Sequence, residues 1–441
     1  MKLQEHLDSF AQRPNLRLAL KSFSYFFSEK VTRVLVGFIL QTWLARHLGP
    51  ENMGIYSYVA DFVGIFIPII LFGFDDILVK DLVRTDEPGK IIGTVFYFRL
   101  ALSAVTWIGL CVSIWIIRRE APEIVIYTIL YGLLLFVRSF DTFLAYFHAK
   151  YLIRSLVRGR QTAYAIVSLA RGFGLWMKFG IVYFMINTFL QNVLEKAFIY
   201  WELRKAAKFE LKFDLTYLKS NIPHALPIAI TSFFVYAETR MGTFFISRYG
   251  TLEDVGVFGV GRGLIDLWEF IPMTICLTVF PIVIKMKDTK PEIYDSKLRK
   301  LYGGLFYLAL CFAFGVAFSS PYIVKHLYGP AFQETAKVMS FGAFLTILTY
   351  LNLARVKWYI LENRTSVWMK LCILSFILNF AFQFYFTKEF ILIGPYISAL
   401  ISQLISNSLM CLFSRSVRED LGHVLSGVFL PFNLLFAKGD K

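Results

Sequence analysis

Ionisable side chains interrupt the first long apolar run of the chain. The stretch YFFSEKVTRVLVGF, residues 25–38, carries Glu29, Lys30 and Arg33. A charge at the centre of a membrane helix costs about 2.5–3.5 kcal/mol, so such residues face protein or water rather than lipid. Four residues share a sector of roughly 80° on a helix: Lys30, Arg33, Gly37 and Gln41. Because Glu29 and Arg33 are spaced i, i+4 and can neutralise each other, Lys30 keeps surplus positive charge. We therefore expect Lys30 and Arg33 to face a cavity.

Two further apolar runs carry charge patterns that admit two interpretations each. Asp61 shares a helix face with Ser57 and Gly64. It either pairs with a cation of the first run or acts in a site. Arg138 and Asp141 are spaced i, i+3, so they form either a self-contained ion pair or part of a cavity.

The seventh and eighth apolar runs contain another group of charges. Arg262, Asp266 and Glu269 lie at i, i+4 and i+7, on one polar face of a helix. We expect Arg262 to pair with Asp266, which leaves Glu269 as the odd charge. Arg240 lies on a polar face of the preceding run, and Glu238 is offset from it. Four acids are candidates for coupling to a proton or a sodium ion: Asp61, Glu238, Asp266 and Glu269.

The elements that must position these residues are membrane helices. Of the 441 residues 57% are hydrophobic and 17% charged, whereas soluble domains are about 45–50% apolar and about 25% charged. Apolar runs of about 20 residues, long enough to cross the hydrocarbon core, recur along the chain. The sequence predicts an all-α integral membrane protein with twelve spans: 22–44, 54–74, 91–117, 123–147, 161–180, 182–203, 223–247, 255–284, 301–324, 334–357, 366–386 and 390–413.

The distribution of basic residues predicts the orientation of these spans. The two termini and every second loop hold 30 Lys and Arg residues when one of these loops is counted over 355–370, and the other loops hold 7 when Lys178 is counted with them. Cytoplasmic loops of membrane proteins collect Lys and Arg. We therefore expect both termini to be cytoplasmic, in a multi-pass protein of a prokaryotic cytoplasmic membrane. The same rule accounts for the formal charge of +15 without nucleic acid as a partner.

The chain also shows an internal repeat. ARHLGPENMGIYSYV (45–59) and SRYGTLEDVGVFGVG (247–261) share an Arg, a Gly, an acidic residue and a Gly followed by an apolar and an aromatic residue. Repeated halves are common in transporters, with the substrate site between them. We predict four parts: an N-terminal lobe, a basic cytoplasmic linker, a C-terminal lobe, and a tail that lies in the cytoplasm or the membrane interface, at 1–203, 204–222, 223–413 and 414–441.

Several motifs resemble those of the polysaccharide-export family, which includes O-antigen repeat-unit flippases. They are LARHLGPENMGIYSYVADFVGIFIPI (44–69), the Pro223 and Pro227 entry to span seven, VGVFGVG (255–261) with FPIVIK (280–285), and LYGPAFQETAKVM (327–339). The family belongs to the multidrug/oligosaccharidyl-lipid/polysaccharide (MOP) superfamily. The resemblance implies twelve helices in two lobes around a central cavity that opens alternately to either side. Where the family often has an Arg-apolar-Asp triplet, this chain has Arg240, Met241 and Gly242, which puts ion coupling through that acid in doubt.

The resemblance implies a polyprenyl-pyrophosphate-linked oligosaccharide as the substrate. Burying one unsatisfied hydroxyl costs roughly 2–7 kcal/mol, so a sugar head crosses hydrocarbon only with help. A wet polar groove lowers that barrier, and Arg binds phosphate bidentately. The predicted pyrophosphate-binding residues are Lys30, Arg33, Arg240 and Arg262. Further cavity candidates are Gln41, Arg138 and Asp141.

Two other functions remain open from the sequence. A multidrug exporter of the same superfamily would favour acids in its cavity, because its substrates are usually organic cations. A membrane enzyme of polysaccharide assembly would need a sizeable extramembrane loop, and none exceeds about 20 residues by this assignment of spans. The chain has no P-loop, HExxH, CxxC or GxSxG motif, and its five cysteines lie in apolar segments.

We accordingly expect no catalytic residues, no metal site, no ATP site and no cofactor besides a coupling proton or sodium ion. The expected partners are the lipid-linked glycan, membrane lipids and polysaccharide polymerase or assembly proteins.

Overall fold

A computed structural model describes residues 14–429 except 151, 207–208 and 290, and the regular secondary structure there is helical throughout. This confirms the predicted all-α fold class. Contacts divide the chain into two compact units, which are described separately. The first unit comprises residues 1–47 and 66–226, and the second comprises 48–65 and 227–441. Residues 48–65 thus pack with the second unit, although the sequence assigned them to an N-terminal lobe. The predicted lobe boundaries stay a prediction.

Helix α2 (Pro14–Leu71) contains one sharp break. Gly49 has φ 73° and ψ 173°, which is not helical. Glycine adopts this positive φ without the steric cost that a Cβ would impose, and Pro50 follows as the first residue of the next helical segment. The break separates the two spans predicted at 22–44 and 54–74.

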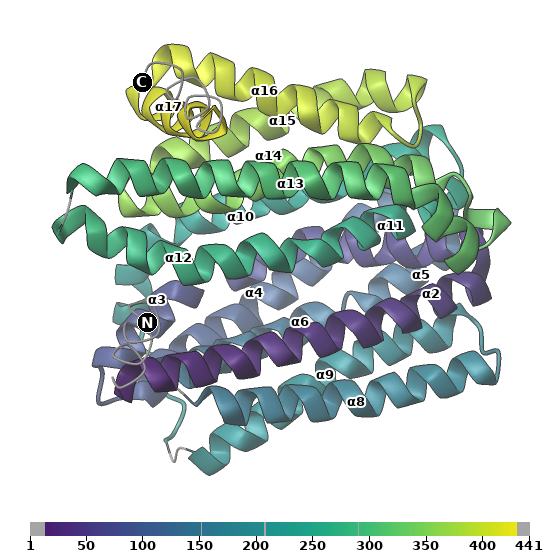
Figure 1. The fold of residues 1–441 in the computed structure, drawn as a ribbon. Coiled ribbons are helices and arrows are strands. Elements are labelled where there is room, and N and C mark those ends of the chain that lie inside the picture. The colour runs from purple at the N-terminus through teal and green to yellow at the C-terminus, as the bar shows by residue number, and fades with distance from the viewer. Residues whose placement is uncertain (1–13, 151, 207–208, 290, 430–441) are drawn as a thin grey trace, which may run out of the picture. The chain divides into compact units, whose positions relative to one another are not determined.

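The first unit contains short helices as well as long ones. Its helices after α2 are α3 (Asp75–Arg84), α4 (Pro88–Ile117), α5 (Pro122–Tyr131), α6 (Leu134–Arg138), the 3₁₀ helix η1 (Ser139–Phe143), α7 (Leu144–Ala149), α8 (Ile153–Trp176) and α9 (Ile181–Ala206). The span predicted at 123–147 is therefore divided among α5, α6, η1 and α7. Helices α8 and α9 pack side by side (Figure 1). Phe74, Leu78 and Leu82 form one buried stripe on and beside α3, in a core that includes Phe143 and Phe147.

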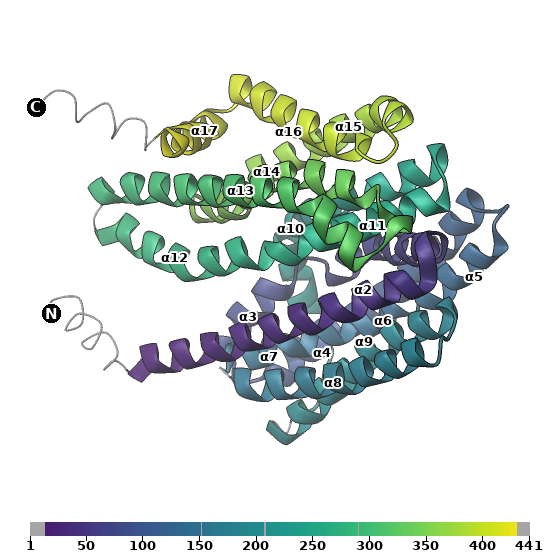
Figure 2. The ribbon, with the colours of Figure 1, turned by 45° about the vertical axis from the view of Figure 1, so that its right-hand side comes forward.

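The second unit is built mainly from long helices. They are α10 (Leu215–Tyr249) from Pro227 onward, α11 (Leu252–Asp266), the 3₁₀ helix η2 (Leu267–Glu269), α12 (Phe270–Thr289), α13 (Pro291–Leu327), the 3₁₀ helix η3 (Pro330–Phe332), α14 (Thr335–Leu361), α15 (Thr365–Glu389), α16 (Gly394–Phe413) and α17 (Arg415–Val428). Helix α13 packs against α14 and α17, and α15 packs against α16. Figure 2 shows α17 beside the end of α16.

The two copies of the predicted repeat motif contact each other within the second unit. Helix α11 begins with a capping box, in which the Asp254 N–H donates to Thr251 Oγ1 and the Thr251 N–H donates to the Asp254 carboxylate. A Cβ on Gly54 would overlap the Leu252 carbonyl, and one on Gly256 would overlap the Pro50 carbonyl. Small residues let membrane helices approach this closely. The glycines of the motif therefore serve the crossing of α2 and α11.

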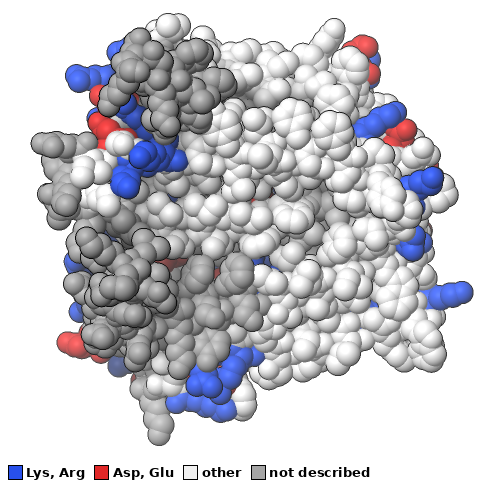
Figure 3. Space-filling model, viewed as in Figure 1, with Lys and Arg blue, Asp and Glu red and all other residues white. Residues whose placement is uncertain are grey.

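Each of the twelve predicted spans overlaps a helix of the structure. Among the described residues, eight helical stretches are long and apolar enough to cross a membrane. The protein is thus a multi-pass membrane protein, and the count of twelve stays a prediction. Figure 3 shows few charged side chains over the middle of the helices on the face in view, with Lys and Arg toward the helix ends. Of the linker predicted at 204–222, the residues up to Ala206 belong to α9 and those from Leu215 onward belong to α10. The end of the tail predicted at 414–441, residues 430–441, lies outside the described residues.

Candidate functional site

Six charged side chains of the first unit form one connected group, called here the first-unit cation cluster. Its members are Arg33, Arg138, Asp141, Arg160, Glu195 and Lys196. They come from α2, α6, η1, α8 and α9. Among the side chains that the structure describes, four cations of the cluster face two carboxylates, which is a formal surplus of positive charge. A surplus of cations in a poorly solvated site favours the binding of an anion.

Glu195 is the centre of this cluster. Its Oε2 lies 3.4 Å from Arg33 Nη2, and its Oε1 lies 3.1 Å from Arg160 Nε and 3.4 Å from Lys196 Nζ. Arg33 Nη2 also donates to the Arg160 carbonyl at 3.1 Å. The ring of Tyr164 lies 5.1 Å from the Arg33 guanidinium, within cation–π range. The carboxylate therefore holds three cations together, and no local sequence spacing indicated it.

Asp141 extends the cluster beyond the ion pair that its sequence spacing predicted. Arg138 Nη1 lies 3.5 Å from Asp141 Oδ2, as the i, i+3 spacing predicted. The pair is not self-contained, however, because Lys196 also forms an ion pair with Asp141. Lys196 is 5% exposed, so its ammonium contacts the carboxylates of Asp141 and Glu195 rather than solvent.

The predicted stripe on α2 divides into different environments. Lys30 is exposed, Arg33 is half-buried and Gln41 is half-buried. Lys30 makes no ion pair with an acid whose side chain the structure describes. The side chain of Glu29 lies outside the described ones. Arg33 pairs with Glu195, 162 positions away in the chain, so helix packing supplies a partner that spacing along one helix did not indicate.

A second charge group lies within the second unit and centres on Asp61. Its carboxylate accepts from Arg240 Nη1 at 3.0 Å, from Arg262 Nη2 at 2.8 Å and from Thr243 Oγ1 at 2.6 Å. Arg262 Nη1 also donates to Thr243 Oγ1 at 3.0 Å. Asp61 is 3% exposed. We call Arg240 and Arg262 the second-unit arginine pair.

This arrangement bears on two expectations. Asp61 pairs with the second-unit arginine pair and not with a cation of the first span, and its role in a site stays a prediction. Arg262 forms the expected ion pair with Asp266, at 3.9 Å, and lies closer to Asp61, at 2.7 Å. Asp61 is the nearer partner because α2 and α11 cross closely at their glycines, which brings its carboxylate to Arg262.

The second unit also contains a cavity of about 460 Å³. Its lining includes Glu238, Arg262 and Glu269, together with amide and hydroxyl side chains of α14, α15 and α16. Glu238 Oε1 accepts from Ser375 Oγ at 2.9 Å. The structure thus brings two of the predicted coupling acids and one predicted phosphate ligand to one cavity. Asp61 and Asp266 are not among its lining residues.

Two buried arginines were not among the predicted site residues. Arg99 is fully buried and donates to Asp75 Oδ1 and to the Leu71 carbonyl, both at 2.7 Å. Arg355, at the end of the span predicted at 334–357, was counted with the cytoplasmic loop at 355–370. It lies within α14, where its Nε donates to Asp420 Oδ2 of α17 at 2.7 Å. Both ion pairs join two different helices, so spacing along one helix carries no signal of either.

Outside the spans, the segment before α10 is attached to the start of α4. Lys90 Nζ lies 3.1 Å from Asp214 Oδ2. The hydrogen bond from Lys90 lowers the pKa of the Asp214 carboxyl, and backbone N–H donors after it act in the same direction. At the other end of the chain, the hydrogen bond from Arg364 lowers the pKa of Glu419.

The described residues contain no group of three or more His, Cys, Asp or Glu that could hold a metal ion.

Sequence comparison identifies the family of the chain. A profile of the polysaccharide biosynthesis protein family matches residues 43–337. The chain belongs to this family. The match confirms the family that the glycine and proline motifs indicated. A search of curated protein sequences found no significant match.

The fold of this polysaccharide biosynthesis protein is similar to solved transporter structures. An inward-facing multidrug resistance MATE family transporter of the MOP superfamily has a TM-score of 0.63 at 15% identity, with 88% of this chain and 96% of that chain covered. The lipid II flippase MurJ, in an inward closed conformation, has a TM-score of 0.60 at 13% identity, with 94% and 92% covered. An outward-facing MATE transporter of the superfamily has a TM-score of 0.54 at 15% identity, with 90% and 96% covered. At these identities the likeness concerns the fold.

Proposed function

We propose that this protein is a flippase. It moves a polyprenyl-pyrophosphate-linked oligosaccharide, such as an O-antigen, capsule or exopolysaccharide repeat unit, from the cytoplasmic to the outer leaflet by alternating access. Membership of the polysaccharide biosynthesis family and a fold similar to that of a lipid II flippase support this proposal. The protein is a transporter rather than an enzyme, acts in a prokaryotic cytoplasmic membrane with both termini in the cytoplasm, and meets polysaccharide polymerase or assembly proteins there.

The observation that carries the proposal is the surplus of cations in the first-unit cation cluster. Glu195 and Asp141 are shared among four basic side chains, and Lys30 adds an exposed ammonium on α2. A pyrophosphate supplies the missing negative charge and accepts charge-assisted hydrogen bonds from guanidinium and ammonium groups. An organic cation would be repelled by the same surplus.

In this mechanism Lys30 and Arg33 bind the pyrophosphate first. The second-unit arginine pair is held by Asp61 in the described state. A phosphate group that reached Arg240 and Arg262 would compete with Asp61 for two guanidinium groups that can bind it bidentately. The proposed transport uses no cofactor and no ATP.

Complementation of a flippase-deficient strain tests the role of Lys30 and Arg33. We expect Lys30→Ala and Arg33→Ala to abolish complementation at normal protein levels. Arg33→Lys keeps the positive charge at this position, so it distinguishes the loss of pyrophosphate binding from the loss of the ion pair with Glu195. Lys219→Ala, at another exposed lysine, serves as the control. Full activity of Lys30→Ala and Arg33→Ala would remove both residues from the site.

Ion coupling is tested separately from substrate binding. Asp61, Glu238, Asp266 and Glu269 remain the candidate acids, and Glu238 and Glu269 lie at the 460 Å³ cavity. We expect transport into vesicles to fall when the proton and sodium gradients are collapsed. Transport that continues unchanged would exclude coupling through these acids.

A multidrug exporter is the second candidate function. The acids at the 460 Å³ cavity and the similarity to MATE folds favour it. Buried carboxylates and aromatic faces suit organic cations. Increased resistance of an expressing strain to cationic drugs, abolished by Glu238→Gln, would support export. Unchanged drug susceptibility together with successful complementation would favour the flippase.

A further inference from the structure

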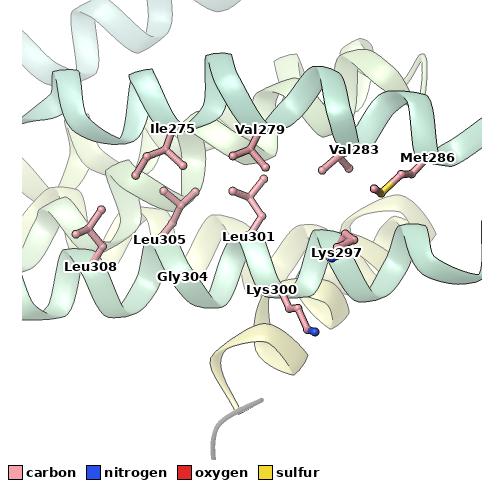
Figure 4. Close-up of a pocket in the computed structure, with 10 residues that line it drawn as sticks. All are labelled: Ile275, Val279, Val283, Met286, Lys297, Lys300, Leu301, Gly304, Leu305 and Leu308. Carbon is pink, nitrogen blue, oxygen red and sulfur yellow. The ribbon is translucent and has the colours of Figure 1, made fainter. Parts of the chain in front are cut away.

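A second, apolar groove lies between α12 and α13, within the second unit. Its volume is about 560 Å³. Two rows of side chains line it, each with the spacing i, i+4, i+8 and i+11, which places a row on one helix face. The rows are Ile275, Val279, Val283 and Met286 on α12, and Lys297, Leu301, Leu305 and Leu308 on α13. Figure 4 shows the apolar side chains of α12 directed toward the leucines of α13.

The groove has the depth of one membrane leaflet. Each row covers eleven steps along its helix, which correspond to about 16 Å at 1.5 Å per residue. Half of a hydrocarbon core about 30 Å thick is about 15 Å. A chain lying between the rows therefore extends from the end of the groove near the membrane surface to the bilayer centre.

The charges of the groove are confined to one end. Lys297 and Lys300 lie at the end beside Met286, and the opposite end is lined by Ile275 and Leu308 (Figure 4). None of the ten described lining residues is acidic. Both lysines are exposed and make no ion pair with an acid whose side chain the structure describes. Long lysine side chains extend along apolar surface and place the ammonium at the membrane interface.

We propose that this groove binds one anionic phospholipid of the leaflet that Lys297 and Lys300 face. The phosphate-bearing headgroup contacts the two ammonium groups, and one acyl chain lies between the two rows. Basic residues beside a gap between membrane helices recognise anionic headgroups in this way. The occupant is a phospholipid rather than a longer isoprenoid lipid because the groove ends at the depth of one leaflet. The proposal is independent of the flippase function.

Gly304 provides the space for the acyl chain. It lies on α13 between the levels of Leu301 and Leu305, and a Cβ built on it would meet no atom within 4 Å. A larger side chain at this position would occupy the groove without a clash in the folded protein. Gly315, on the same helix but outside the groove, has equally open surroundings and provides a matched control.

Lipid binding to the purified full-length protein tests the headgroup contact. Native mass spectrometry in detergent compares added phosphatidylglycerol with phosphatidylcholine of the same acyl chains. Each lysine near a headgroup contributes about fivefold to the affinity for an anionic lipid. We expect the Lys297→Gln/Lys300→Gln variant to bind phosphatidylglycerol about 25-fold more weakly, with phosphatidylcholine unchanged. Lys370→Gln, at an exposed lysine outside the groove, should bind as the wild type does.

A second pair of variants tests the acyl chain. Gly304→Leu should lose at least tenfold in affinity for phosphatidylglycerol, and Gly315→Leu should not. Equal binding of phosphatidylglycerol and phosphatidylcholine by the wild type, or wild-type binding by Gly304→Leu, would overturn the proposal. Tighter binding of a polyprenyl phosphate than of phosphatidylglycerol would overturn the assigned occupant.

Discussion

Replacing Asp61 with Asn removes a buried negative charge and keeps the shape of the side chain. Asp61 is 3% exposed and accepts hydrogen bonds from Arg240 at 3.0 Å and Arg262 at 2.8 Å. Removing one partner of a buried ion pair costs about 3–5 kcal/mol, because the remaining charge is left unpaired. The side chain of Arg240 is 30% exposed, so solvent compensates part of its loss. We therefore expect the lower end of this range, about 3 kcal/mol.

This cost converts into a measurable shift of the melting temperature. For a domain of roughly 200 residues, 1 kcal/mol lowers Tm by about 2–4 °C. The Asp61→Asn variant should accordingly unfold about 6–12 °C below the wild type. Tryptophan fluorescence during thermal unfolding of the purified protein in detergent measures the shift.

Asp266→Asn is the matched control. Asp266 carries the same charge and faces the same Arg262, but the contact is 3.9 Å long and the side chain is 40% exposed. Such pairs contribute about 0–1 kcal/mol, so Tm should fall by less than about 4 °C. Adding Arg240→Gln to Asp61→Asn should recover part of the lost stability. Equal shifts for Asp61→Asn and Asp266→Asn would refute the assignment of Asp61 as the principal partner of the arginines.

Three other predictions concern helix packing, the C-terminal helix and pH. Gly256→Ala should lower Tm, because its methyl group overpacks the crossing of α2 and α11 at a cost of about 1–3 kcal/mol. At Gly263 a Cβ meets nothing within 4 Å, so Gly263→Ala should leave Tm unchanged or raise it. Arg355→Gln removes the ion-pair partner of the buried Asp420 carboxylate, which costs about 3–5 kcal/mol of stability, and should make α17 sensitive to limited proteolysis. An equal effect of Arg415→Gln, at an exposed arginine of α17, would contradict this. The lowered pKa of Asp214 means that its ion pair with α4 contributes stability above the unfolded-state pKa of about 3.9 and loses it as pH falls through the folded-state pKa. The Tm difference between wild type and Asp214→Asn should therefore be largest at neutral pH and vanish in acid; a difference that persists at pH 2 would refute it.

Local sequence patterns predicted elements and individual charged residues better than they predicted ion-pair partners. The i, i+3 pair of Arg138 and Asp141 exists, and all four pyrophosphate candidates lie on helices. Spacing along one helix identifies neighbours on that helix only. Glu195 and Arg355 escaped notice because their partners come from other helices, and Arg355 was also assigned to a loop that the structure replaces with the last turns of α14.

The amino-acid sequence by itself determined that the chain is a helical membrane protein of the polysaccharide biosynthesis family. Hydrocarbon admits only segments that satisfy their own backbone hydrogen bonds, so runs of about 20 apolar residues predict helices whatever surrounds them. Only the tertiary structure decided which carboxylate meets which cation. The rotation and crossing of helices set those distances, and the glycines that bring α2 and α11 together place Asp61 against Arg240 and Arg262, about 180 and 200 positions away along the chain.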